Sequence, residues 1–179
     1  MIGGLAEVLA VLTVGSVTVL PPNATALDLS AALKSLDEAP LEAWSDQARS
    51  FRFIWLPPFP SQRVISVRIQ DTAKGALLSA KAVALSGGVV ARAERRLSTA
   101  EWDELVEARQ DGFWKFHPQE YPQPFFDGAT WILEGAASGE RLRIVQHVPS
   151  PGAFVDLCRR MFLLSGVRLH DSESSLVAR

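Results

Sequence analysis

The sequence predicts an α+β domain in which an antiparallel sheet of about six strands carries two helices on one face. Residues 63–71 alternate apolar and polar side chains, and this period of two is typical of a strand with one buried face. Gly87-Gly88 separates two apolar runs and predicts a tight hairpin. Ser98 and Glu101 have the spacing of a capping box, so a helix is expected to begin there.

The first half of the domain is predicted to be a meander of four strands. The segments with strand composition are 51–56, 63–71, 76–85 and 89–97. A proline-rich loop at 57–60 ends the first of them, because proline has no N–H to donate to a central ladder. Turn residues at 72–75 and the Gly87-Gly88 pair separate the others. Neighbouring segments are therefore expected to pair in antiparallel fashion.

A helix over 98–110 follows the meander. Four side chains recur at helical spacing after the capping box: Trp102, Leu105, Val106 and Arg109. Asp111-Gly112 is expected to end the helix, and its apolar stripe is expected to cover the sheet.

A second hairpin and a last helix complete the predicted domain. Segments 130–135 and 141–148 flank turn residues at 137–140, and Glu134 is expected to pair with Arg141 or Arg143 at an exposed site of this hairpin. The apolar positions of the last helix, over 152–164, are Phe154, Leu157, Cys158, Met161 and Phe162. Their spacing predicts an amphipathic helix.

The N-terminal segment 1–26 is predicted to be a secretory signal peptide. Residues 2–20 are apolar or small apart from Glu7, and Ala24 and Ala26 fit a small-residue cleavage site. The segment lacks the positive charge that usually precedes such a run, and an uncleaved membrane anchor or a buried strand are the alternatives. Residues 27–50 are interpreted as a helical lead-in, 51–166 as the α+β domain and 167–179 as a polar tail.

Composition limits the functions open to the chain. A hydrophobic content of 47% is enough for a sizeable core, and the formal net charge of −2 provides no basic field for nucleic acid. One cysteine excludes an intramolecular disulfide, and three histidines are too scattered for a recognisable metal site. No cofactor motif is found, so neither a cofactor, a metal nor a nucleic-acid partner is expected.

Several segments resemble one group of proteins. They are the 51–56 run, Leu97-Ser98 with Glu101-Trp102, Phe113-Trp114, and the 127–135 segment Asp-Gly-Ala-Thr-Trp-Ile-Leu-Glu-Gly. Over roughly residues 50–165 the chain is similar to an uncharacterised group of small bacterial proteins that are often exported. The resemblance implies a bacterial protein located in the periplasm or secreted. It carries no known activity and no site residues.

Two aromatic and proline-rich loops are the predicted contact site, because aromatic side chains are enriched in protein interfaces. The candidate residues are Trp55, Phe59, His117, Glu120, Tyr121, Phe125, Phe126 and Asp127. The favoured function is a non-catalytic module that binds a protein or peptide. One alternative is a small hydrolase-like or ligand-binding enzyme that uses the 117–128 loop, and another is a structural component tethered to a membrane through residues 2–20.

Cys158 is also a candidate catalytic nucleophile. His147 is the base that would activate its thiol. Cys158 nevertheless lies on the apolar face of the last predicted helix, between Phe154 and Phe162. We therefore expect it to be a buried hydrophobic side chain.

Overall fold

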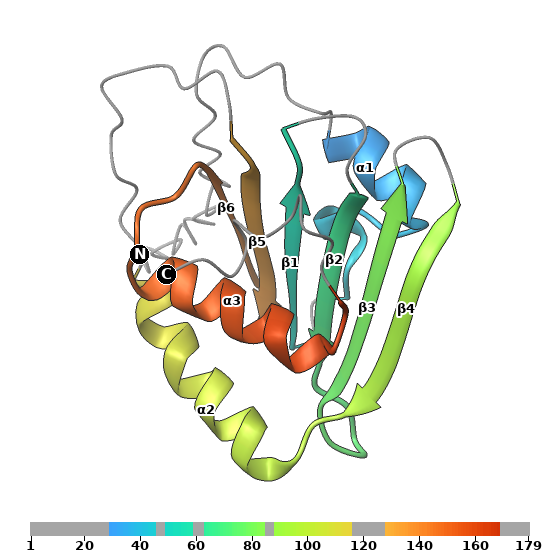
Figure 1. Ribbon diagram of the computed structural model, residues 1–179. Helices are drawn as coiled ribbons and strands as arrows, with labels where there is room; N and C mark the ends of the chain where they lie inside the picture. The colour runs from blue at the N-terminus through green and yellow to red at the C-terminus, as the bar shows by residue number, and fades with distance from the viewer. Residues whose placement is uncertain (1–28, 46–48, 59–62, 85–87, 116–127, 169–179) are drawn as a thin grey trace, which may run out of the picture.

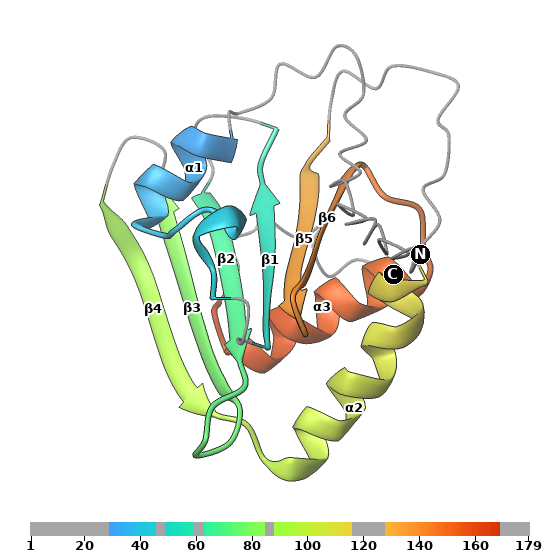
Figure 2. The same ribbon diagram turned by 180° about the vertical axis from the view of Figure 1, so that it is seen from behind.

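The computed structural model describes residues 29–45, 49–58, 63–84, 88–115 and 128–168. Its centre is one six-stranded antiparallel sheet with the strand order β4-β3-β2-β1-β5-β6 (Figures 1 and 2). The strands are β1 (Ser50–Leu56), β2 (Arg63–Gln70), β3 (Leu77–Ala84), β4 (Val89–Arg96), β5 (Thr130–Ala137) and β6 (Glu140–His147). The predicted α+β fold, with its four-strand meander and separate hairpin, is confirmed.

Strand β1 is the centre of the sheet. It pairs with β2 on one side and with β5 on the other, and Phe53 is aligned with both Val67 and Leu133. All seven residues of β1 are buried, because elements cover both faces of the sheet at this strand. The chain returns from the meander to the middle of the sheet, so the later hairpin β5-β6 extends the sheet from β1 outward.

One face of the sheet carries helices α2 (Thr99–Arg109) and α3 (Ala153–Ser165) (Figure 1). The predicted capping box is present, since the Ser98 hydroxyl accepts a hydrogen bond from the Glu101 N–H and the Glu101 carboxylate accepts one from the Ser98 N–H. The α-helix ends at Arg109, within one residue of the predicted 98–110 range, but the chain does not turn away at Gly112 as expected. The chain continues through a π-helical turn, η2 (Gln110–Trp114), which carries Phe113 into the core with no exposed area.

Glycines 112 and 135 allow this turn to pack closely. A Cβ at Gly112 would lie 2.5 Å from the Ala153 carbonyl oxygen of α3, and a Cβ at Gly135 would lie 2.7 Å from Cζ of Phe113. The Phe113 ring meets Phe51 edge to face, with 6.1 Å between the ring centroids. The two glycines thus let η2 approach α3 and β5 at distances that a side chain would prevent.

The other face of the sheet is covered by the predicted helical lead-in (Figure 2). Helix α1 (Leu29–Leu36) and the short 3-10 turn η1 (Leu41–Ala43) lie against it. The side chains of Ala32, Leu33 and Leu36 are buried, and Lys81 on β3 donates to the carbonyl oxygens of Leu36 and Asp37. The lead-in is therefore a third layer of the fold.

Each layer of helices has its own apolar core. The larger core lies between the sheet and α2, η2 and α3 and contains Phe53, Trp55 and Cys158 among its fully buried side chains. The smaller one lies under α1 and contains Ile54, Val64 and Ile132. Successive residues of β1 thus alternate between the two cores, as a strand inside a three-layer structure requires.

Candidate binding site

Most of the sequence-predicted contact residues lie outside the described residues. This holds for Phe59 and for the six predicted residues of the second loop, which are His117, Glu120, Tyr121, Phe125, Phe126 and Asp127. Trp55 is described, and its side chain has no exposed area because it lies in the larger core on the central strand. Trp55 therefore does not offer its side chain to a partner in this structure.

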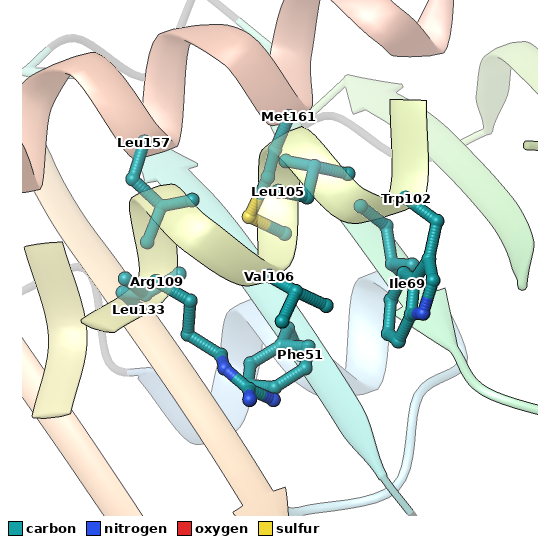
Figure 3. Close-up of a pocket in the computed structure, with 9 residues that line it drawn as sticks. All are labelled: Phe51, Ile69, Trp102, Leu105, Val106, Arg109, Leu133, Leu157 and Met161. Atoms are coloured by element: carbon teal, nitrogen blue, oxygen red, sulfur yellow. The ribbon is translucent and has the colours of Figure 1, made fainter. Parts of the chain in front are cut away.

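A different site is formed between α2 and the sheet, where the helix leaves a pocket (Figure 3). The pocket is shallow: its volume of about 290 Å³ consists mostly of open space at its mouth, and the enclosed part has room for about one water molecule. The lining residues come from β1, β2 and β5 of the sheet and from both helices: Phe51, Ile69, Leu133, Trp102, Leu105, Val106, Arg109, Leu157 and Met161. The lining is apolar apart from the Arg109 guanidinium and the Trp102 indole nitrogen.

The helix contributes four of these residues through the spacing that the sequence predicts. Trp102, Leu105, Val106 and Arg109 lie one turn apart in pairs, so they share one face of α2. The capping box fixes where the helix begins and therefore which face turns toward Phe51 and Ile69. Only Leu105 is fully buried, which leaves the other three side chains along the wall and mouth of the pocket.

Arg109 is the only charged residue in the pocket lining, and it has no ion-pair partner among the described residues. Its guanidinium carbon lies 4.7 Å from the centroid of the Phe51 ring, within the range of a cation–π contact. Its Nε atom is buried and has no hydrogen-bond partner. Burial lowers the pKa of Arg109, and the positive charge of Arg49 lowers it further. The guanidinium stays charged, so the mouth of the pocket is positive.

The opposite face of the sheet holds a buried ionic network. Glu134 has no exposed side-chain area; it accepts from Nε and Nη2 of Arg52 and, at 2.7 Å, from Nε of Arg143. Nη1 of Arg52 donates to the Glu38 carboxylate at 3.0 Å and to the Ala39 carbonyl oxygen at 2.7 Å. The predicted pairing of Glu134 with Arg143 is confirmed, but the expectation of an exposed site is wrong because η1 covers it.

Protein groups satisfy the centre of this network, so we assign it a structural role. The guanidinium of Arg52 lies 4.9 Å from the Trp44 ring centroid, and that of Arg68 lies 4.7 Å from the same ring. Burial lowers the pKa of Arg68, and the neighbouring charge of Arg52 adds to the effect. The network joins the segment 38–44, which follows α1 and contains η1, to strands β1, β2, β5 and β6.

The structure confirms the expected burial of Cys158. Its side chain has no exposed area, and burial raises the pKa of the thiol well above its usual range. A thiolate is the reactive form, so this cysteine acts as a small core side chain. The His147 ring lies elsewhere, with Nδ1 3.2 Å from the Thr130 hydroxyl oxygen.

Neither models of protein families, nor curated proteins, nor solved structures match this chain. In the part of the chain that the structure describes, no helix is long and apolar enough to cross a membrane. The same described ranges contain no group of three or more His, Cys, Asp and Glu residues able to hold a metal ion.

Sequence reasoning placed the α2 residues on one face but missed the pocket. Phe51, Ile69 and Leu133 come from three strands, and their meeting depends on a register that a single sequence does not contain. Arg109 is the residue that could have indicated the pocket from sequence, because a cation at the end of an otherwise apolar helical stripe is unusual for a core position.

Proposed function

We propose that the protein is a binding module in which a small outward movement of α2 lets the pocket between this helix and the sheet take a compact apolar group that carries a carboxylate. The observation that carries this proposal is Arg109, whose guanidinium lies at the mouth of an apolar pocket and has, among the described residues, neither an ion-pair partner nor a hydrogen-bond partner for its buried Nε. Ligand sites typically combine an apolar lining with few polar groups that fix orientation. A guanidinium is suited to a carboxylate because its N–H groups match the two oxygens.

The surrounding charges favour an anion over a neutral ligand. Arg49 raises the positive potential at Arg109, as its effect on the Arg109 pKa indicates. Its own partner, Asp71, is 3.8 Å away, and the side chain of Arg49 is 60% exposed. A carboxylate at the pocket mouth would thus meet two cations, of which only one has a counter-charge in the described structure.

Two sources supply this chemistry: a free monocarboxylic acid and the C-terminal residue of a peptide. The second agrees with the peptide-binding function predicted from the sequence. The aromatic loops predicted as a contact surface remain a prediction, since they lie outside the described residues apart from Trp55.

The test is a titration followed by NMR shifts of the α2 amides and of the Trp102 indole N–H, with tryptophan fluorescence as a second readout. Octanoate is compared with octan-1-ol, and a tripeptide ending in leucine is compared with its C-terminal amide. We expect one acid to bind at least about tenfold more tightly than its neutral counterpart, which is the scale of a charge-assisted hydrogen bond. Tighter binding of octanoate would identify a free monocarboxylic acid as the ligand, and tighter binding of the tripeptide would identify a peptide C-terminus.

The matched variants are Arg109→Gln and Lys34→Gln, each of which removes one positive charge. Lys34 lies on α1, on the other side of the sheet. We expect Arg109→Gln to abolish the preference for the acid while Lys34→Gln leaves it unchanged. Equal binding of acids and neutral compounds, or an unchanged preference in Arg109→Gln, would contradict the proposal.

We also propose that the protein is exported by the signal-like segment 1–26, which lies outside the described residues. The apolar run at 2–20 and the small residues Ala24 and Ala26 support this. Intact mass spectrometry after expression of the full chain in a bacterial host tests it. Soluble extracytoplasmic protein that begins at Leu27 is expected, and an intact Met1 in the cytosol would contradict export.

A further inference from the structure

Strand β4 is an open edge of the sheet. It pairs with β3 on one side, and no described element lies along its other side (Figures 1 and 2). Exposed edges are templates for pairing with another strand, and natural proteins often block them with charged side chains. The charges on β4 therefore determine which strands it is able to accept.

The outward backbone groups of β4 follow from its pairing with β3. The Leu97 N–H donates to the Ala76 carbonyl oxygen at 2.9 Å, and Ala93 is aligned with Ala80. Hydrogen-bonded and non-hydrogen-bonded pairs alternate along an antiparallel ladder, so Ala93 is bonded to β3. The backbone groups of its two neighbours, Arg92 and Glu94, point away from the sheet.

The side chains of Arg92 and Glu94 are exposed on the same face of β4. The structure gives neither of them an ion pair within the described residues. They flank Ala93, which packs against the larger core on the other face. A positive and a negative charge thus lie on either side of a small residue, on the outer edge of the sheet.

We propose that a second copy of this chain pairs with β4, in antiparallel orientation, about a twofold axis at Ala93. In this register Arg92 faces Glu94 of the partner subunit, and the twofold axis repeats the pair with the roles exchanged. Both residues direct their backbone groups outward, so they also form the hydrogen-bonded positions of the new ladder. A twofold interface of this kind uses the same patch on both subunits.

Repulsion between like charges disfavours the neighbouring registers of the proposed dimer. Centring the axis on Glu94 brings Glu94 against Glu94 of the partner subunit, and Arg92 against Arg96 of the partner subunit. Centring it on Arg92 brings Arg92 against Arg92 of the partner subunit. Like charges directly opposite each other destabilise an antiparallel pair, whereas opposite charges stabilise it. Only the register centred on Ala93 matches every Arg92 with a glutamate.

Two apolar side chains at the start of the strand add to this surface. Val89 is 45% exposed and Val90 is 54% exposed, and the proposed register places the long Arg96 side chain of the partner subunit beside Val90. Arginine side chains cover apolar surface with their methylene groups while the charged end stays in water. Pairing would therefore remove apolar area from solvent at both ends of the shared ladder.

The experiment measures the mass of the full chain by sedimentation over a concentration series reaching the millimolar range. The wild type is expected to form a dimer. Arg92→Glu and Glu94→Arg each place like charges opposite each other, and each is expected to raise the dimer dissociation constant about tenfold or more. Arg92→Lys keeps the charge and is the control.

A mixture of the two charge variants gives the decisive result. Combining Arg92→Glu chains with Glu94→Arg chains restores opposite charges at both positions, so a mixed dimer is expected where neither variant forms one alone. A monomeric wild type throughout the series would overturn the proposal. A dimer that is unaffected by the single variants, or a mixture that stays monomeric, would also overturn it. Far-UV circular dichroism of each variant checks that the fold is intact.

Discussion

Glu134 shows how one residue at the centre of the sheet joins distant parts of the chain. Its carboxylate, with no exposed area, binds Arg52 on β1 and Arg143 on β6. Removing one member of a buried pair costs far more than removing an exposed pair, because the remaining charge stays buried without its partner. The same network holds Glu38 and Trp44 against the sheet.

We predict that Glu134→Gln lowers the free energy of unfolding by about 3 kcal/mol, measured by urea denaturation. Arg52 then keeps only Glu38 as a carboxylate partner within the described residues. The matched control is Glu42→Gln. Glu42 also pairs with Arg143, at 3.1 Å, but its side chain is 65% exposed, so its loss is expected to cost less than about 0.5 kcal/mol. Similar costs for both variants would contradict the structural role of the buried network.

At the scale of elements, the N-terminus of α2 makes stability depend on pH. Hydrogen bonds from Arg95, followed by those from the Ser98 backbone and side chain, lower the pKa of Glu101 from 4.5 to about 2. The folded state therefore stabilises the ionised Glu101 carboxylate more than the unfolded chain does. The contribution of Glu101 to the free energy of unfolding is complete above about pH 5 and is lost as the pH falls from 4.5 toward 2.

The expected result is a pH-dependent difference between the wild type and Glu101→Gln. Glutamine still fits a capping box, so the variant removes mainly the charge that faces Arg95. The difference in free energy of unfolding is expected to be largest near neutral pH and to shrink between pH 4.5 and about 2. Glu107→Gln, at an exposed position of the same helix, is the control. A difference that stays constant or grows on acidification would contradict the assignment.

Helix α2 buries fewer side chains than α3. Leu105 is its only fully buried residue, whereas α3 buries seven. Elements with few buried apolar contacts open locally at lower free energy. We therefore predict faster amide hydrogen exchange in α2 than in α3, and slower exchange in α2 once the preferred acid is bound. Equal protection of the two helices would contradict this difference.

Local sequence signals predicted the elements well because each depends on neighbouring residues. The capping box at Ser98 and the two-residue alternation of β2 require no knowledge of the rest of the chain. The π-helical turn η2 was missed because its cause is distant in sequence: Gly112 lies against the Ala153 backbone of α3, and Phe113 packs on Gly135 of β5. A glycine after a helix usually marks its end, and here it allows close contact instead.

The candidate pocket was only half predictable for the same reason. The shared face of Trp102, Leu105, Val106 and Arg109 follows from helical spacing, but the opposing wall depends on strand order. Arg52 is a clearer case. It is a single cation in an apolar strand, and its partner Glu134 lies 82 residues later in the chain. Sheet register alone brings the two together.

At the scale of the whole molecule, the sheet is stabilised from both sides. Three buried side chains of α1, Ala32, Leu33 and Leu36, pack on the face of the sheet opposite to α2 and α3. The folded unit therefore includes the segment interpreted from the sequence as a lead-in. A helix of eight residues is too short to be stable alone in water, so its order depends on this apolar contact and on the Lys81 bonds at its C-terminus.

We predict that Leu33→Ala lowers the free energy of unfolding by about 2–5 kcal/mol, the range for a truncated core leucine. The matched control is Leu163→Ala on α3, where the leucine is 66% exposed and the cost is expected to be below about 0.5 kcal/mol. Near-UV circular dichroism, which reports on the packing of the aromatic side chains and therefore includes Trp55 and Trp131 of the sheet, is compared with far-UV circular dichroism during urea denaturation. If α1 is an integral layer, both signals of Leu33→Ala shift together to lower urea. A sheet transition that stays at the wild-type midpoint would show instead that α1 is an appendage that unfolds separately.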